Sequence, residues 1–266
     1  MNVETIQLIE PKQAIAAAFS KAAKSYDKCA AFQRKVADHL LNQLPSDLSG
    51  YHVLDVGCGT GYCSELLRAR GAKVTAFDLS ASMLHEAERR CGQDGMEYVQ
   101  GDVETLSFPF EQFDVVYSSL ALQWCNDLSV PLEQIKRVTK RHGVICFSTL
   151  VDGSLQELKN AWNKVDSNQH VNTFTSQDAI KVALAQTGLV HHQLDFEAIQ
   201  MWYPSAISLM KDLKGIGANH LSAQRNQGLH GRSKLLAVEN AYLNYQNQQG
   251  LLPATYQVCF GVIIND

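Results

Sequence analysis

The sequence predicts an α/β fold with a doubly wound, largely parallel sheet, and three observations predict it. Residues 52–56 form a short apolar run with β-branched side chains, which is typical of a buried strand. Gly57, Gly59 and Gly61 follow at alternate positions, and a helical stretch then leads to a second apolar run that ends at Asp78. The first half of a doubly wound sheet has this order of elements: a strand, a glycine turn, a helix, a second strand and an acidic residue.

Two helices are predicted ahead of the sheet. Pro11 suits the first position of a helix, and Phe19 and Tyr26 then share one face by their i, i+7 spacing. A second amphipathic stretch covers residues 32–44 and ends before a proline. We expect these helices to form a cap within residues 1–45.

Within the sheet, the first helix is predicted at residues 65–70, with Gly71 as its C-terminal cap. Later strands are predicted where short apolar runs occur, and helices where the apolar residues recur with a helical period. The strands fall at 72–77, 97–100, 113–118, 144–150, 192–202 and 256–264, and the helices at 155–165 and 177–186.

Residues 204–253 separate the last two strands and are too many for a structureless loop in a compact domain. Two helical patches, AISLMKDLK and SKLLAVENAYLNYQ, lie within them. We therefore expect a small helical lid, inserted before the last strand. Together with the N-terminal cap it would overhang the carboxyl ends of the strands, where ligands bind in open α/β sheets.

The glycine turn distinguishes three classes of nucleotide ligand. A triphosphate-binding loop needs a lysine after its last glycine, and no Lys or Arg occurs between Gly57 and Arg68. A dinucleotide fingerprint needs a glycine at its sixth position, where Tyr62 stands here. The G-x-G-x-G spacing leaves bare backbone beside the first strand, which suits a flat ligand without phosphates, such as S-adenosylmethionine (SAM). A glycine turn without a ligand is the alternative.

Two acids at strand ends fit an adenosine ligand. Asp78, 21 residues after Gly57, can accept hydrogen bonds from both ribose hydroxyls, although this spacing fits a dinucleotide equally well. Asp102 can accept a hydrogen bond from the adenine amino group while the backbone N–H of Val103 donates to a ring nitrogen. The alternative for Asp102 is the N-cap of a helix that starts at Val103.

The segments LDVGCGTG, AFD and GDVETL resemble those of the class I, Rossmann-like SAM-dependent methyltransferases. Five further segments are similar to the family of malonyl-acyl-carrier-protein O-methyltransferases of biotin synthesis: AIAAAFSKAAKSYDKCA, LALQWC, STLVDGSL, LKGIGANH and TYQVCFGVI. The resemblance implies one domain, residues 1–266, whose core (51–203 and 254–266) holds a seven-stranded sheet with an antiparallel last strand. It also implies SAM as cofactor and methyl transfer to the free carboxylate of malonyl-acyl carrier protein, the start of pimelate synthesis.

We expect twelve residues to bind SAM. Most lie in the glycine turn or at the ends of strands, and Ser118 and Leu120 are expected to form the floor of the site. The twelve are Asp55, Gly57, Cys58, Gly59, Gly61, Asp78, Leu79, Met83, Asp102, Val103, Ser118 and Leu120.

Methyl transfer to a carboxylate needs no general base, because an acid with a pKa near ~4 is already ionised at neutral pH. The reaction joins an anion to a cation, so a dry site that aligns the two partners favours it. We therefore look for positioning groups, and find no evident pair of His and Asp. The candidate catalytic residues are Tyr26, Gln123 and Trp124. We expect Tyr26 to cover the methionine end of SAM, and the other two to hold the cofactor's edge or the acyl group. Packing is the alternative for both aromatic residues.

Cationic side chains of the predicted lid are candidates for binding the substrate. Lys214, His220, Arg225 and Arg232 can contact the malonyl carboxylate or the phosphate of the carrier's phosphopantetheine arm, a contact that suits arginine. Each is alternatively a solvated surface charge.

The distribution of charge indicates the kind of partner. A net charge of −4 argues against nucleic acid. Residues 1–35 and 204–240 each carry a net charge of +3, so the rest of the chain carries −10. Two positive segments on an acidic body indicate a docking surface for an acidic partner, and malonyl-acyl carrier protein is the expected one, with malonyl-coenzyme A as the alternative thioester.

The seven cysteines include no C-x-x-C pair and no histidine at zinc-ligand spacing, so we expect free thiols and no metal. No apolar run reaches the length of a membrane helix, and the N-terminus lacks the features of a signal peptide, so we expect a cytoplasmic protein. We also expect a monomer. Three other functions stay open: a methyltransferase for another small carboxylate or a quinone-type carbon, a dinucleotide-dependent oxidoreductase, and a non-catalytic SAM-binding regulator.

Overall fold

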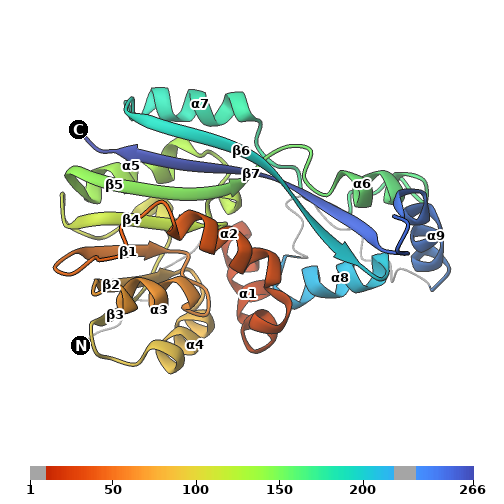
Figure 1. Ribbon diagram of the computed structural model, residues 1–266, viewed down its shortest axis with the longest axis horizontal. Coiled ribbons are helices and arrows are strands. Elements are labelled where there is room, and N and C mark those ends of the chain that lie inside the picture. The colour runs from red at the N-terminus through yellow and green to blue at the C-terminus, as the bar shows by residue number, and fades with distance from the viewer. Residues whose placement is uncertain (1–9, 219–231) are drawn as a thin grey trace.

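The computed structural model describes residues 10–218 and 232–266, and its centre is a seven-stranded sheet (Figure 1). The strands are β1 His52–Val56, β2 Lys73–Asp78, β3 Met96–Gln100, β4 Phe113–Ser119, β5 Thr139–Leu150, β6 His192–Tyr203 and β7 Leu252–Ile264. Their order is β3-β2-β1-β4-β5-β7-β6. β1 to β5 pair in parallel, whereas β7 runs antiparallel to β5 and β6, so the predicted sheet is confirmed.

Helices pack on both faces of this sheet and beyond one end of it (Figure 1). The α-helices of the described residues are α1 Glu10–Cys29, α2 Ala31–Leu41, α3 Tyr62–Ala69, α4 Ala81–Cys91, α5 Ser129–Val138, α6 Gln156–Asn163, α7 Gln177–Gln186, α8 Ala206–Gly215 and α9 Arg232–Tyr242. Short 3₁₀ turns are η1 Val103–Thr105, η2 Leu122–Trp124 and η3 Leu243–Tyr245.

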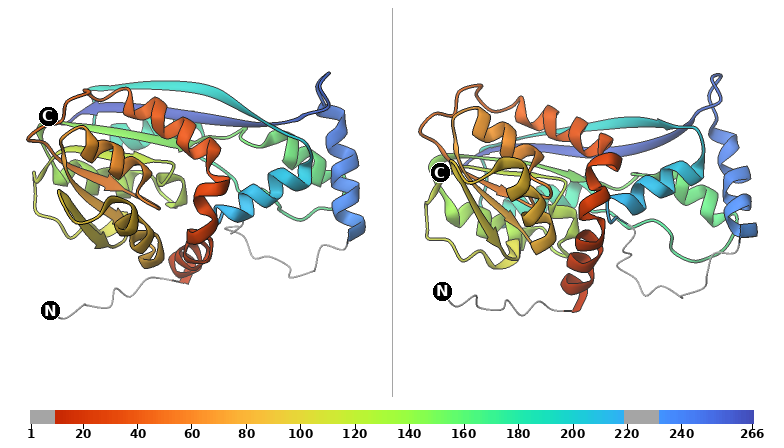
Figure 2. Two further views of the ribbon diagram at one scale, coloured as in Figure 1. Left: turned by 60° about the horizontal axis from the view of Figure 1, so that its bottom comes forward. Right: turned by 90° about the horizontal axis from the view of Figure 1, so that it is seen from below.

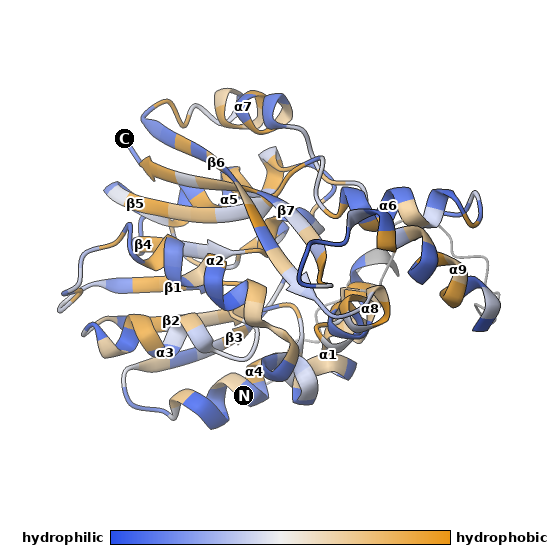
Figure 3. Ribbon diagram, turned by 45° about the vertical axis from the view of Figure 1, so that its right-hand side comes forward, coloured by the Kyte–Doolittle hydropathy of each residue, from blue (hydrophilic) through white to orange (hydrophobic). Residues whose placement is uncertain are grey.

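Alternate residues of each strand enter two separate cores on opposite faces of the sheet. Val53 packs into the core shared with α2, α3 and α4, and its neighbour Leu54 packs into the core shared with α5 and α7. This period of two is the one expected of strands that are buried on both faces. The central strands are accordingly coloured mostly hydrophobic in Figure 3.

Several element boundaries differ from the prediction, among them the start of β7, at Leu252 and not at residue 256, and two of the differences have a clear physical reason. α3 begins at Tyr62 and not at residue 65, because Gly61 takes a left-handed conformation (φ 81°) that ends the glycine turn at once. β5 begins at Thr139 and not at residue 144, because the pairing of β4 with β5 starts at Thr139 and resumes at Val144 after a register shift. The residues of this bulged stretch are mostly polar, so the sequence does not indicate that they form a strand.

β6 and β7, of 12 and 13 residues, extend beyond the other strands as a long hairpin toward α6, α8 and α9 (Figures 1 and 2). Residues 204–251 lie between these two strands and contain α8 and α9, so the predicted insertion of residues 204–253 ends two residues earlier than expected. α1 joins this region to the sheet: the Ser25 hydroxyl donates to the carbonyl oxygen of Gly215 at 3.0 Å, and the hydroxyls of Ser20 and Ser80 lie 2.8 Å apart at the start of α4. No helix in the described part of the chain is both long and apolar enough to cross a membrane.

Candidate active site

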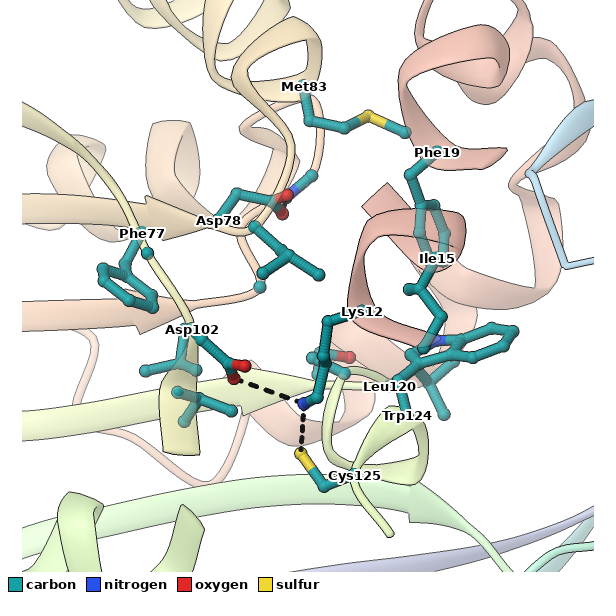
Figure 4. A pocket seen from close by; sticks show the side chains of 18 of the residues that line it. Lys12, Ile15, Phe19, Phe77, Asp78, Met83, Asp102, Leu120, Trp124 and Cys125 are labelled. Carbon is teal, nitrogen blue, oxygen red and sulfur yellow. Dashed lines mark hydrogen bonds and ion pairs between the residues drawn. The ribbon is translucent and has the colours of Figure 1, made fainter. Parts of the chain in front are cut away.

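A cavity opens at the carboxyl ends of β1, β2 and β4, and α1 covers it (Figure 4). It encloses about 710 Å³ of empty space, part of which is open solvent at its mouth. We call it the strand-end cavity. Its lining residues are Lys12, Ile15, Phe19, Tyr26, Val56, Gly57, Gly59, Phe77, Asp78, Leu79, Met83, Gly101, Asp102, Val103, Ser119, Leu120, Ala121, Trp124 and Cys125.

Asp78 is the buried acid at the end of β2. Its Oδ2 accepts a hydrogen bond from the backbone N–H of Gly59 at 2.9 Å, and its Oδ1 accepts one from the backbone N–H of Ser80 at 2.8 Å. Burial raises the pKa of Asp78 to about 6, although these hydrogen bonds oppose the shift. Each oxygen keeps a further acceptor position, so the carboxylate can receive two neighbouring hydroxyls, as in the diol of a ribose.

The glycine turn exposes backbone to the same cavity. Gly57 and Gly59 have φ angles of 71° and 54°, in the left-handed region that favours glycine. A Cβ atom at Gly57 would lie 2.3 Å from the Cβ of Ala121, whereas a Cβ at Gly59 would meet no atom within 4 Å. The turn therefore packs tightly against the loop after β4 on one side and stays open to a ligand on the other.

Lys12 of α1 reaches into the opposite end of the strand-end cavity, as Figure 4 shows. Its Nζ lies 3.2 Å from Oδ1 of Asp102, 3.0 Å from Oε1 of Glu104 and 3.8 Å from the sulfur of Cys125. Burial alone would lower the pKa of Lys12, but Cys125 and the two carboxylates raise it above its ordinary value. Asp102 also caps η1 by accepting a hydrogen bond from the N–H of Glu104 at 3.1 Å. The capping alternative for Asp102 therefore coexists with a place in the cavity.

A smaller cavity, which we call the inner cavity, shares the lining residues Tyr26, Gly57, Gly59 and Ser119 with the strand-end cavity. Side chains of both signs line it, namely Asp27, Arg34 and Asp55. Burial raises the pKa of Asp55 to about 7, and its carboxylate accepts a hydrogen bond from the hydroxyl of Ser64 at 2.5 Å. Arg34 Nη1 donates to the carbonyl oxygen of Asp27 at 2.7 Å. A pocket with both charges suits the ammonium and carboxylate groups of an amino acid.

A third cavity, the side cavity, holds about 690 Å³ of empty space and lies beside the first. Four residues line both: Phe19, Tyr26, Leu120 and Trp124. The Phe19 and Trp124 rings meet edge to face, with centroids 5.3 Å apart. Leu120 has a φ of 52°, a strained value for leucine, and its N–H donates to the carbonyl oxygen of Ser148 at 3.0 Å. The strained backbone thus places Leu120 at the boundary between two cavities.

The remaining lining of the side cavity comes from several elements. It consists of Phe32, Gln33, Gln123, Leu150, Leu155, His170, Val171, Asn172, Phe174, Leu213, Ile216, Ala218 and Tyr256. The Oε1 atoms of Gln33 and Gln123 are buried and have no hydrogen-bond partner among residues 10–218 and 232–266, while Nε2 of Gln123 donates to the carbonyl oxygen of Leu120 at 2.8 Å. The side cavity is therefore mainly apolar, with a few polar groups available to a ligand.

The structure brings most of the predicted site residues together. Asp55 and Cys58 line the inner cavity, and Gln123 lines the side cavity. The other residues that converge do so on the strand-end cavity: Tyr26, Gly57, Gly59, Asp78, Leu79, Met83, Asp102, Val103, Leu120 and Trp124.

Two residues predicted to bind the cofactor, Ser118 and Gly61, line none of the three cavities and have evident packing contacts. The hydroxyl of Ser118 is buried and donates to the carbonyl oxygen of Val56 at 3.0 Å, and the next residue, Ser119, lines the cavity, because successive side chains of β4 point to opposite faces. A Cβ at Gly61 would lie 2.9 Å from Ala87, so this glycine lets α3 pack closely on α4.

Of the four predicted substrate-binding residues, the structure describes two. Lys214 on α8 and Arg232 at the start of α9 are exposed and line none of the three cavities. His220 and Arg225 lie outside the described residues.

Two residues that line the cavities, Lys12 and His170, are not indicated by the sequence. The sequence does not indicate that Lys12 lines a cavity, because a lysine in the first turn of an amphipathic helix is usually solvated. His170 lines the side cavity, and its Nε2 lies 2.7 Å from Oδ1 of Asp166. Their i, i+4 spacing was the available signal, but the two residues follow α6 in a segment without regular structure.

Comparison with known proteins decides the family. A methyltransferase-domain family matches residues 54–147. The chain is 45% identical over 255 residues to the malonyl-[acyl-carrier protein] O-methyltransferase of Serratia marcescens. This alignment covers 96% of each of the two chains. It is 41% identical to the enzyme of the same name from Salmonella typhimurium, over 96% of this chain and 98% of the relative. The chain belongs to the malonyl-[acyl-carrier protein] O-methyltransferase family.

Solved structures agree with this family at the level of the fold. The YcgJ protein of Bacillus subtilis superposes with a TM-score of 0.62 at 16% identity, over 87% of this chain and 98% of its own. A phosphoethanolamine N-methyltransferase of Haemonchus contortus, solved with S-adenosylhomocysteine, gives a TM-score of 0.60 at 16% identity, over 97% and 60% of the two chains. The fold of the O-methyltransferase is therefore the Rossmann-like one of class I methyltransferases.

The enzyme is a SAM-dependent methyltransferase, and its residues fit this cofactor. Gly59 leaves open space where any other residue would place a Cβ atom, and Asp78 keeps acceptor positions beside it. When bound, SAM supplies a methyl group on a positively charged sulfur, which is the electrophile of the reaction.

Proposed function

We propose that this enzyme transfers the methyl group of SAM to the free carboxylate of a malonyl group carried as a thioester on acyl carrier protein. The relatives' names point to this substrate, and one structural observation supports it. The cavity that suits a nucleoside and the mainly apolar side cavity share a wall of four residues, so that a cofactor and an acyl group would meet there.

The cofactor's parts correspond to the strand-end cavity and the inner cavity, which share part of their lining. In this proposal Asp78 accepts hydrogen bonds from the ribose hydroxyls, and Asp102 accepts one from the adenine amino group, with Lys12 beside it. The methionine end enters the inner cavity, where Asp55 and Arg34 provide charges of both signs. Because Tyr26 lines all three cavities, the sulfonium would lie near the shared wall.

The chemistry asks the protein to position and dehydrate the partners. The malonyl carboxylate is ionised at neutral pH, so no base is required. Burial raises the pKa of Tyr26 far above its ordinary value, so the phenol stays protonated and can cover the reacting groups or donate to them. Phe19 and Trp124 exclude water from the shared wall, which favours a reaction in which opposite charges disappear.

The methyl ester has a consequence for the pathway. It hides the negative charge of the malonyl group, so that the enzymes of fatty-acid elongation can extend the chain toward pimelate for biotin. In this proposal the enzyme acts as a monomer in the cytoplasm.

A positive face on the α1–α8 side would receive the carrier. Lys21, Lys24 and Lys28 are exposed along α1, and none forms an ion pair with another described residue. Lys211 and Lys214 are exposed on α8, which is bound to α1 through the hydrogen bond from Ser25. We infer that Lys214 serves this docking face and not the cavity, since it lines none of the cavities. An acidic carrier would be attracted to such a face.

The direct test is methyl transfer itself. The purified protein is incubated with SAM and, in parallel, malonyl-acyl carrier protein, malonyl-coenzyme A and free malonate, and mass spectrometry looks for one added methyl group. Methyl ester on the thioesters and not on malonate is the expected result. Transfer to none of them, with SAM still bound, would contradict the proposal and direct attention to other carboxylates or quinone-type carbons.

A further inference from the structure

A fourth cavity, which we call the polar cavity, shares lining residues with the strand-end cavity and the side cavity. It encloses about 1360 Å³ of empty space, part of which is open solvent. Half of the described residues that line it carry an uncharged amide or hydroxyl group, and none of them is a lysine, arginine, histidine, aspartate or glutamate. This lining suits a neutral ligand with several hydrogen-bonding groups. The amide and hydroxyl side chains are those of Gln123, Asn126, Thr149, Asn172, Thr173 and Thr175.

The lining of the polar cavity extends from the surface to the shared wall. Asn126 and Thr173 are exposed, whereas Thr149, near the end of β5, is only 1% exposed. Trp124, a member of the shared wall, lines the polar cavity as well as the strand-end and side cavities (Figure 4). Gln123 lines both the polar cavity and the side cavity. A ligand that enters at the exposed end would therefore reach the place where the cofactor and the acyl group meet.

Two buried oxygen atoms in this lining are available to such a ligand. Oγ1 of Thr149 and Oε1 of Gln123 have no hydrogen-bond partner among residues 10–218 and 232–266. The amide nitrogen of Gln123 donates to the carbonyl oxygen of Leu120 at 2.8 Å, and this hydrogen bond orients the side chain. Because a buried polar atom without a partner is costly, both positions favour a ligand that supplies N–H and C=O groups. An amide supplies both.

We propose that the polar cavity binds the pantetheine part of the carrier's phosphopantetheine arm, an inference that rests on the proposed function. Between its phosphate and its thioester, this arm carries amide groups, a hydroxyl and methyl groups, and no charge. Thr149 and Gln123 form hydrogen bonds with the amides, while Leu122 and Leu128 contact the methyl groups. The phosphate stays at the surface, because the described lining offers it no cation.

The proposal sets the order in which the parts of the substrate lie. The thioester lies beside Gln123 and Trp124, because these two residues line both the polar cavity and the side cavity. The malonyl group then extends into the side cavity, with its carboxylate at the shared wall. Binding of the arm, remote from the reacting atoms, thus positions the carboxylate for methyl transfer. Free malonate has no arm and is not held in this way.

Substrates with and without the arm test the proposal. Methyl transfer is measured with malonyl-coenzyme A and with the S-methyl thioester of malonate, which keeps the acyl group and the sulfur but lacks the arm. We expect Asn126→Trp to lower kcat/KM for malonyl-coenzyme A by about 10-fold or more, because the indole occupies space that the arm needs, and to spare the S-methyl thioester. Thr149→Val preserves the shape of the side chain and should lower it about 3- to 10-fold, as for loss of one neutral hydrogen bond.

A control variant and a binding measurement accompany these assays. Asn163→Trp, at the exposed end of α6, lines none of the four cavities and should behave as wild type with both substrates. Calorimetry with S-adenosylhomocysteine present measures the binding of pantetheine itself, which has no acyl group. Asn126→Trp, at an exposed position, should weaken this binding, and this result does not depend on turnover or on the folding of Thr149→Val.

The results separate two failures. Methyl transfer by the wild type, with Asn126→Trp affecting both substrates equally or neither of them, would overturn the assignment of the polar cavity alone. The same holds if Ala218→Trp, in the side cavity after α8, impairs only malonyl-coenzyme A and Asn126→Trp does not, since the arm would then pass beneath α8. Absence of methyl transfer by the wild type to malonyl-acyl carrier protein and to malonyl-coenzyme A would overturn the proposed function and this inference with it.

Discussion

Replacing Asp78 with alanine tests the assignment of this carboxylate to the ribose. Each oxygen of Asp78 accepts one backbone N–H in the structure, so each has room for one ligand hydroxyl. A hydrogen bond to a charged group contributes about 1.5–3 kcal/mol, and two would contribute about 3–6 kcal/mol, part of which water recovers in the variant. We expect Asp78→Ala to weaken SAM binding by about 2–4 kcal/mol, or about 30- to 1,000-fold.

Isothermal calorimetry with SAM measures this loss directly. Asp94→Ala, at an exposed acid that lines none of the cavities, is the matched control and should leave the Kd unchanged. Because burial raises the pKa of Asp78 to about 6, wild-type affinity should also fall as the pH drops through 6, since the protonated acid is a poorer acceptor. An unchanged Kd in a folded Asp78→Ala protein would refute the reasoning and remove this carboxylate from the site.

Three other predictions concern stability and docking. The pKa of Asp55 is raised from 3.8 to about 7 in the folded protein, so its contribution to stability is present below pH 4 and is lost as the pH rises through 7. Urea unfolding should find Asp55→Asn more stable than wild type by about 3 kcal/mol at pH 8 and equal to it near pH 4; a constant difference would contradict this. Lys12→Met leaves two partly buried carboxylates without their cation and should cost about 2 kcal/mol of stability, whereas an unchanged urea midpoint would show the ion pairs to be dispensable. Replacing Lys21, Lys24 and Lys28 with Glu should raise KM for the carrier-bound substrate and spare the coenzyme A thioester, and equal effects on both would argue against a docking face on α1.

The sheet and the cofactor side of the site could be predicted because their signals are local. The glycine turn, the apolar runs beside it and Asp78 lie within 27 consecutive residues, 52–78, and each follows directly from backbone geometry. Gly57 and Gly59 show this well: their positive φ angles and the space around them require glycine, so their spacing alone indicates the shape of the turn.

The rest depends on contacts between distant segments. Lys12 meets Asp102 across 90 positions, and nothing in the first helix indicates that its lysine is buried. Ser118 and Ser119 differ by one step of a strand, and the choice between them follows from which face the neighbouring strands cover. The side cavity draws on segments from Phe19 to Tyr256, so no short motif predicts its lining.

The wall shared by the two cavities limits how the enzyme's specificity can change. A smaller residue at any position of this wall would enlarge the strand-end cavity together with the side cavity, because all four residues line both. The four are Phe19, Tyr26, Leu120 and Trp124. Leu213 and Ile216, at the end of α8, line only the side cavity. If the side cavity holds the acyl group, as proposed, acceptance of longer acyl chains can evolve, or be engineered, through the helices between β6 and β7 without altering the lining of the strand-end cavity.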